Sequence, residues 1–156
     1  MKSQRQKKAM KILLALDGSI HSKATVEDVA KRLFSPNTHV RIVSAYEKGS
    51  LITPMGPLGA AKEVYTIGNK YALNAAKKVI ETAAKILSEK NPTLTITTKA
   101  IQDSPKSAIL NEAERFGADL IVVGSHGAGP VGRFLLGSVS QAVALHAKCS
   151  VEIVRK

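Results

Sequence analysis

Positions 120–139 read Leu-Ile-Val-Val-Gly-Ser-His-Gly-Ala-Gly-Pro-Val-Gly-Arg-Phe-Leu-Leu-Gly-Ser-Val, and this stretch decides the fold. Its first four residues, Leu120 to Val123, are all apolar, which is typical of a strand buried on both faces of a parallel sheet. The glycines that follow let backbone N–H groups approach a bulky anion. A helix is predicted next, over residues 138–146, and the unpaired N–H groups at a helix start favour negative charge. The stretch therefore predicts a buried strand, a phosphate-binding turn and a helix, in that order.

The rest of the chain alternates between strand and helix patterns. Further strands are predicted over 12–16, 40–46, 94–100 and 150–154, and further helices from Ser22 as N-cap through Leu33, over 62–89, and from Ser104-Pro105 to Gly117. Residues 47–61 carry several glycines and prolines, so we expect a long loop there. Arg41 is an unusual interior residue for its strand. The order indicates α/β architecture, with a doubly wound parallel sheet and a ligand crevice at the carboxyl ends of its strands.

Composition sets the class of protein. The chain has 156 residues, of which 44% are hydrophobic, enough for one domain with its own core. No apolar stretch approaches the roughly 18–20 residues that span a bilayer, and the N-terminus lacks the apolar core of a signal peptide. The single cysteine, Cys149, rules out an internal disulfide and suits a reducing compartment. We therefore expect a soluble, cytoplasmic protein with no membrane association.

The net charge of +11 makes nucleic acid a candidate partner. Much of the excess lies at the N-terminus, because residues 1–11 hold five Lys or Arg and no acid. We expect residues 1–9 to form a basic, flexible tail ahead of a domain over 10–156. Aromatic residues make up only 4% of the chain, so platforms for stacking bases are scarce.

The sequence resembles three common functional motifs only in part. The glycines of 127–132 match G-x-G-x-x-G, but they follow the fourth strand rather than the first, and the next acidic residue, Glu152, lies in the last predicted strand. The glycines of 132–138 have P-loop spacing without its lysine. Ser125 and His126 lack the G-x-S-x-G elbow of a hydrolase, so His126 is interpreted as part of the loop. Dinucleotide, P-loop and serine-hydrolase chemistry are therefore not expected.

The spacing does resemble the universal stress protein family, whose ATP-binding members carry G-2x-G-9x-G-[ST]. Gly124, Gly127, Gly137 and Ser138 stand at those spacings, and Asp17-Gly-Ser follows the first predicted strand as in that family. The resemblance covers all but the first nine residues. It implies a five-stranded parallel sheet in the order 3-2-1-4-5 with helices on both faces. It also implies that Asp17 and the glycine segment face each other.

The resemblance further implies a nucleotide site. Asp17 would lie beside the ribose and phosphates, and backbone around Ala45 would meet the adenine. The ribose and phosphate contacts would come from Val123, Gly124, Gly127, Gly137, Ser138 and Val139. The sequence departs from the family at Ser44-Ala45, where His-Val is common, and around Cys149, where prolines are common. A homodimer through the strand at 150–154 is also implied.

Together these features predict a regulatory protein of the stress response that binds ATP or AMP. One alternative is a slow ATPase in which Asp17 carries a magnesium ion and Arg133 approaches a phosphate. Hydrolysis needs a positioned water, a base and a charge stabiliser, and no second acidic residue has suitable spacing, so enzymatic turnover is not the favoured interpretation. The other alternative is a basic protein associated with nucleic acid through its tail.

Overall fold

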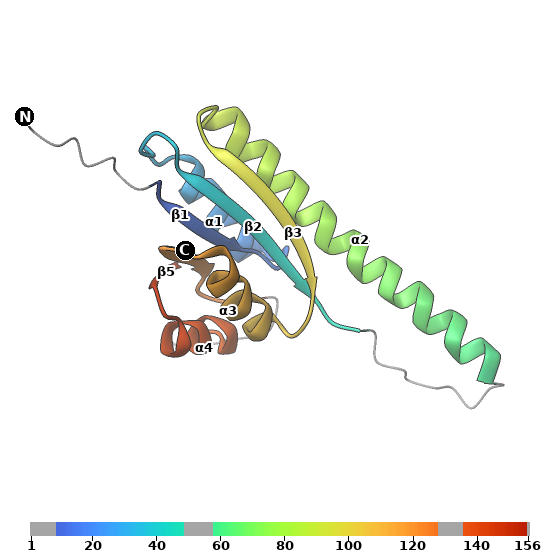
Figure 1. Cartoon of the computed structure of the whole chain (residues 1–156). Coiled ribbons are helices and arrows are strands. Elements are labelled where there is room, and N and C mark those ends of the chain that lie inside the picture. Colours follow the sequence, from blue (N-terminus) through green and yellow to red (C-terminus); the bar gives the residue numbers. More distant parts are fainter. Residues whose placement is uncertain (1–8, 49–57, 128–135, 156) are drawn as a thin grey trace, which may run out of the picture.

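The computed structural model describes residues 9–48, 58–127 and 136–155, with backbone only for 58–66. Within these ranges strands and helices alternate along the chain (Figure 1). The elements are β1 (Lys11–Ala15), α1 (Ile20–Ala30), β2 (His39–Tyr46), α2 (Leu58–Lys90), β3 (Thr95–Gln102), α3 (Pro105–Phe116), β4 (Leu120–Gly124), α4 (Ser138–His146) and β5 (Ser150–Val154). Among the described residues, no helix is both long enough and apolar enough to cross a membrane.

The five strands form one parallel sheet in the order β3-β2-β1-β4-β5, so the predicted topology is confirmed. The central strand β1 pairs with β2 on one side and with β4 on the other. Ala15, at its carboxyl end, is in register with Val43 of β2 and Val123 of β4. Because the chain winds away from β1 in both directions, the carboxyl ends of β1 and β4 border a crevice.

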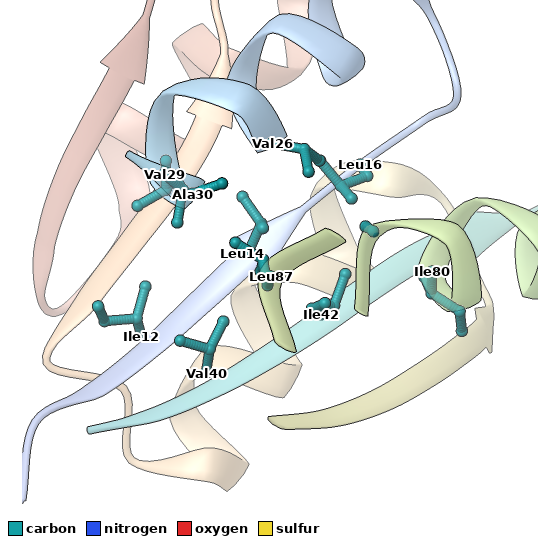
Figure 2. Close-up of a cluster of buried hydrophobic side chains, with 12 residues drawn as sticks. Ile12, Leu14, Leu16, Val26, Val29, Ala30, Val40, Ile42, Ile80 and Leu87 are labelled. Atoms are coloured by element: carbon teal, nitrogen blue, oxygen red, sulfur yellow. The ribbon is translucent and has the colours of Figure 1, made fainter. Parts of the chain in front are cut away.

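Helices cover both faces of the sheet, as predicted. Alternate residues of a strand point to opposite faces, so Leu14 packs toward α1 and α2 while Leu13 packs toward α3 and α4. Figure 2 shows the first of these clusters, in which Leu14 lies among Val29 of α1 and Leu87 of α2. Leu13, Leu14 and Leu87 are fully buried, and each such side chain contributes about 1.5–3 kcal/mol through its removal from water.

Several helix ends differ from the sequence-based prediction. The N-cap of α1 is Ser19, whose hydroxyl accepts a hydrogen bond from the backbone N of Ser22 at 3.2 Å, so the prediction of Ser22 as the cap was wrong. The helix ends at Ala30, and Leu33, expected on its buried face, is fully exposed. α2 begins at Leu58, inside the predicted loop.

The ends of α3 agree with prediction. Pro105 occupies its first turn after the N-cap Ser104, where the missing N–H costs nothing. Gly117 ends the helix with φ of 67°, a left-handed conformation that favours glycine. β3 is an edge strand whose residues are all partly or fully exposed.

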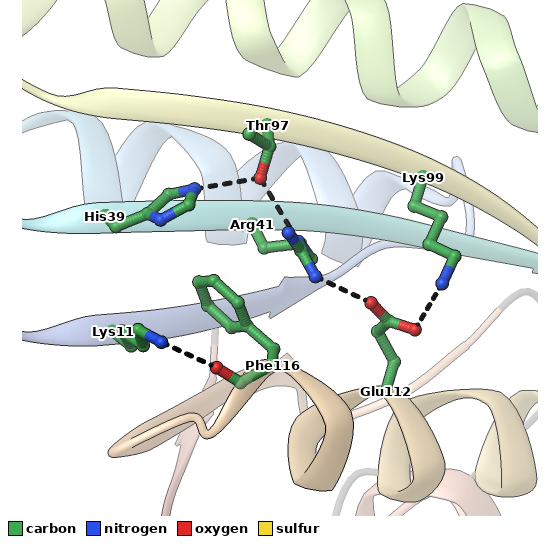
Figure 3. Close-up of polar contacts among 7 residues, drawn as sticks. All are labelled: Lys11, His39, Arg41, Thr97, Lys99, Glu112 and Phe116. Atoms are coloured by element: carbon green, nitrogen blue, oxygen red, sulfur yellow. Dashed lines mark hydrogen bonds and ion pairs between the residues drawn. The ribbon is translucent and has the colours of Figure 1, made fainter.

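A polar network explains the arginine inside β2 (Figure 3). Arg41 Nη1 donates to Glu112 Oε1 of α3 at 2.9 Å, and Lys99 Nζ of β3 donates to Glu112 Oε2 at 2.6 Å. Arg41 Nε also donates to Thr97 Oγ1 at 3.2 Å, and its guanidinium lies 4.3 Å from the centre of the Phe116 ring. Glu112 is only 2% exposed. The network therefore fixes α3 onto β2 and β3.

Candidate functional site

A pocket opens at the carboxyl ends of β1, β2 and β4. Its lining residues are Ala15, Leu16, Asp17, Ser22, Val43, Ala45, Pro105, Ala108, Ile109, Val123, Gly124, His126, Gly127, Gly137, Ser138, Val139 and Ser140. All eight site residues named from the sequence are in this lining, although they come from four separate parts of the chain. The location is the crevice of an open α/β sheet at which ligands characteristically bind.

One wall of the pocket is apolar. Val43 and Ala45 of β2, Ala108 and Ile109 from the first turns of α3, and Ala15 of β1 all contribute apolar side chains to the lining. These side chains offer no charge and few polar atoms, which suits a flat, weakly polar group. Sequence reasoning identified Ala45 but missed the contribution of α3. The Ser104-Pro105 start signal gave the position of this helix, but not which strand its first turn would cover.

Asp17 contributes a carboxylate to the pocket lining. Its Oδ1 accepts hydrogen bonds from Ser22 Oγ at 2.6 Å and from the backbone N of Ser19 at 2.9 Å. Ser22 Oγ in turn accepts from the backbone N of Asp17 at 2.8 Å. Burial alone would raise the pKa of Asp17, but the hydrogen bonds from Ser19 and Ser22 outweigh it and hold the pKa below its ordinary value of 3.8. Asp17 is therefore a fixed, negatively charged group at neutral pH.

The glycine segment lies directly against Asp17. A Cβ added to Gly127 would lie 3.0 Å from Asp17 Oδ2, and one added to Gly124 would lie 3.2 Å from Thr25 Oγ1. The expectation that Asp17 and the glycine segment face each other is confirmed by this contact. Side chains larger than hydrogen at these two positions would displace their neighbours and narrow the pocket.

The start of α4 forms the third side of the pocket. Gly137 is its N-cap, and the first helical hydrogen bond runs from Gln141 N to Gly137 O at 2.9 Å. The amides of 138–140 precede that bond, so they belong to the group of donors that a helix leaves without intrahelical partners. Ser138 is the first helical residue and is exposed. The pocket thus has the positive end of a helix on one side.

Ser125 and Ser140 hold the turn before α4 in place. Gly137 N donates to Ser125 O at 2.8 Å, and Ser140 Oγ contacts both Ser125 O at 3.1 Å and Gly137 O at 2.9 Å. Ser125 Oγ lies 3.0 Å from His126 Nδ1, a contact that sequence reasoning did not expect. Ser125 is only 1% exposed, so its hydroxyl is not placed to attack a substrate.

Metal ligands are sparse in this pocket. No three His, Cys, Asp or Glu side chains of the described residues are grouped so that they could hold a metal ion. Asp17 is the acidic residue in the lining. A single carboxylate suits Mg²⁺ only when water and substrate phosphates supply the other ligands. Arg133, named from the sequence as a residue that approaches a phosphate, lies outside the described residues.

Comparison with solved structures agrees with this fold. The structure of the protein MJ0577 superposes with a TM-score of 0.79 at 22% identity, covering 94% of this chain and 95% of that one. A universal stress protein family member from Arabidopsis thaliana with AMP bound gives a TM-score of 0.62 at 18% identity, covering 94% and 92%. A universal stress protein in complex with cAMP gives 0.63 at 23% identity, covering 94% and 97%.

Sequence comparison adds the family. The family model described as "Universal stress protein family" matches residues 8–155. A curated relative from Thermus aquaticus, the universal stress protein in the QAH/OAS sulfhydrylase 3′ region, is 33% identical over 147 residues, covering 92% of this chain and 97% of the relative. With a match across nearly its whole length and an agreeing sheet order, the chain belongs to the universal stress protein family.

Proposed function

We propose that this protein binds an adenine nucleotide, ATP or AMP, as a regulatory component of a stress response. The observation that carries the proposal is the meeting of an apolar slot, a fixed carboxylate and a helix start in one pocket at the switch point of the sheet. These three features correspond to a base, a ribose and a phosphate group. Similar folds have been solved with AMP and with cAMP, which supports the same ligand class here.

The proposed contacts follow the shape of the pocket. Adenine lies in the slot beside Ala45, and Asp17 meets the ribose and phosphate end. The remaining contacts are assigned to Val123 and Gly124 at the ribose, and to Gly127, Gly137, Ser138 and Val139 at the phosphates, mainly through backbone N–H groups. Four or five hydrogen bonds to charged oxygens at about 1.5–3 kcal/mol each, together with burial of the adenine, can reach roughly 8 kcal/mol after association costs, a micromolar affinity.

Regulatory binding fits the pocket better than rapid hydrolysis. Phosphoryl transfer needs a nucleophile-orienting group, a metal ion or arginine and a protected site, and the described lining offers one carboxylate. Asp17 could hold Mg²⁺ together with ATP phosphates, which defines the alternative of a slow ATPase. Phosphate release that is the same in wild type and Asp17→Ala would remove that alternative.

The first experiment is native mass spectrometry of the purified protein, which should show a bound adenine nucleotide. The second is calorimetric titration with ATP and AMP of wild type, Gly127→Ala and Gly137→Val. An added Cβ on Gly127 lies 3.0 Å from Asp17 Oδ2, and one on Gly137 lies 3.3 Å from Ser125 O and His126 Cα. We expect at least about a tenfold loss of affinity, the equivalent of one charge-assisted hydrogen bond.

Gly68→Ala is the matched control, because Gly68 lies in α2 and an added Cβ would meet no atom within 4 Å. This variant should bind like wild type. Thermal unfolding of each variant shows whether any loss of binding reflects loss of folded protein. Wild-type protein that binds neither nucleotide, or pocket variants that bind as tightly as Gly68→Ala, would refute the proposal.

The assembly and the basic tail are further parts of the proposal. β5 is at one edge of the sheet, and an exposed edge can pair with a second copy, so we propose a homodimer through β5, to be checked by sedimentation. The nucleic-acid alternative predicts binding that weakens steeply with salt and is lost on deletion of residues 1–9. Residues 1–8 lie outside the described part of the chain.

A further inference from the structure

His126 carries a buried hydrogen-bonding atom without a partner in the described part of the chain. Its Nε2 is the single buried side-chain nitrogen or oxygen, among the residues that the structure describes, without a hydrogen-bond partner. Buried polar atoms are nearly always paired, because desolvation without a partner is costly. His126 is also part of the pocket lining. An atom of this kind at a binding pocket indicates that its partner arrives with the ligand.

Ser125 determines what this atom can do. Its hydroxyl is buried and lies 3.0 Å from His126 Nδ1. A buried hydroxyl needs an acceptor for its proton, and Nδ1 is the acceptor within reach. The proton of a neutral His126 then resides on Nε2, and a protonated imidazole carries a proton there as well. In both states Nε2–H is a donor, which suits an oxygen of the ligand.

The position of His126 indicates that the ligand oxygen that accepts from Nε2–H belongs to a phosphate group. A Cβ on Gly137, the N-cap of α4, would lie 3.3 Å from His126 Cα, so His126 borders the positive end of that helix. The ring of His21 lies 5.4 Å away, centre to centre. The next residue, Gly127, lies against the carboxylate of Asp17. A phosphate entering here meets a negative carboxylate, so additional donors are needed to compensate for that repulsion.

We propose that His126 is the side chain that makes the site selective for phosphorylated adenosine, by donating its Nε2–H to a phosphate oxygen. The inference rests on the proposed function and deepens it, because the backbone amides of the glycine segment and α4 can donate hydrogen bonds to phosphate whatever side chains these residues carry. Ser125 is the positioning residue that fixes the tautomer of the imidazole. Adenosine, which lacks phosphate, gains nothing from His126.

The test compares AMP with adenosine by calorimetric titration of wild type, His126→Phe, His126→Gln and the control His146→Gln. His146 is an exposed residue at the end of α4, outside the pocket lining. His126→Phe should weaken AMP binding about 10- to 100-fold, the worth of a hydrogen bond to a charged group, and leave adenosine binding unchanged. His126→Gln retains an N–H donor and should recover part of the AMP affinity, while His146→Gln should match wild type.

A second measurement uses wild-type protein and needs no variant to fold. In nitrogen-15 spectra of the histidine rings, AMP should shift the Nε2 signal of His126, and adenosine should leave it in place. Equal losses of AMP and adenosine affinity in His126→Phe, or an Nε2 signal that does not respond to AMP, would overturn the inference while the proposed function stands. Wild-type protein that binds neither ATP nor AMP would overturn both.

Discussion

Replacement of Arg41 by methionine tests how a buried carboxylate is held in this fold. Glu112 is 2% exposed, and its oxygens accept from Arg41 Nη1 at 2.9 Å and from Lys99 Nζ at 2.6 Å. Arg41 is the better shielded of the two cations, with a side chain 26% exposed against 46% for Lys99. It also contacts Thr97 and the Phe116 ring. Loss of Arg41 leaves the buried carboxylate of Glu112 paired with Lys99, whose side chain is half-exposed.

The expected loss of unfolding free energy in each variant follows from the difference in solvent exposure between Arg41 and Lys99. Removal of one partner from a buried ion pair costs about 3–5 kcal/mol, because the other charge remains buried. Lys99 still compensates Glu112 in part, whereas the lost contact with Phe116 adds about 0.5–1 kcal/mol. We expect Arg41→Met to lower the free energy of unfolding by about 2–4 kcal/mol. Lys99→Met should cost less than about 1 kcal/mol, because solvent screens a half-exposed pair.

Urea denaturation distinguishes these outcomes. With a slope of about 2 kcal/mol/M for a domain of this size, Arg41→Met should move the midpoint down by about 1–2 M, and Lys99→Met by less than about 0.5 M. The double variant Arg41→Met/Glu112→Leu should regain most of the loss, since no buried charge remains. Equal losses for the two single variants, or a double variant no more stable than Arg41→Met, would refute the reasoning.

Backbone conformation and acid sensitivity give two more predictions. Gly18→Ala should lower the free energy of unfolding by about 1–3 kcal/mol, because Gly18 has φ of 80° and an added Cβ would lie 2.9 Å from Val79 Cγ2. Gly117→Ala should cost only about 1 kcal/mol, since its φ is 67° but the nearest atom is 3.9 Å away; equal midpoint shifts in urea would contradict this comparison. Asp17→Asn should remove stability that depends on the carboxylate: because the folded pKa lies below 3.8, this contribution is present above about pH 4 and is lost as the pH falls through the folded pKa. If the difference in unfolding free energy between wild type and Asp17→Asn stayed constant from neutral to strongly acidic pH, the Asp17 carboxylate would not make this pH-dependent contribution to stability.

The elements that the sequence predicted best are those whose local chemistry leaves few options. Leu120 to Val123 is apolar throughout, and a run of this kind is stable only when both faces are covered. Pro105 and Gly117 mark the ends of α3 because one lacks an N–H and the other adopts a left-handed backbone. The sheet order, by contrast, was implied by the family resemblance, because nothing in strand composition specifies which strands become neighbours.

The two misplaced helix starts have different physical causes. Ser19 and Ser22 are both good capping residues, and the choice between them depends on Asp17, which engages the Ser22 hydroxyl in two hydrogen bonds. That leaves Ser19 to cap α1. The glycines and prolines of residues 47–61 predicted a loop, but α2 already begins at Leu58. Gly59 lies in the first turn of this helix, where a glycine destabilises the helix little.

Part of the pocket lining was predictable from the sequence, whereas the buried ion pair outside the pocket was not. The glycines were named because they follow the most apolar strand and let backbone N–H groups approach an anion, and Asp17 was named because of the family resemblance. Glu112 was missed, although it stands at core spacing in α3 between Ile109 and Phe116. An acid at an apolar position of a helix, together with the arginine inside β2, is a signal that could have revealed the pair, but their separation of 71 residues hid it.

The same helix links the buried ion pairs to the pocket. Ala108 and Ile109 form part of the apolar wall, and Glu112, one helical turn further on, attaches α3 to Arg41 and Lys99. A nucleotide in the slot would therefore stabilise the element that these pairs already hold against the sheet. Loss of Arg41 should then weaken binding through the position of α3 rather than through any contact with the ligand. For that reason AMP and adenosine should lose affinity by the same factor in Arg41→Met, in contrast to the selective loss expected of a residue that touches phosphate.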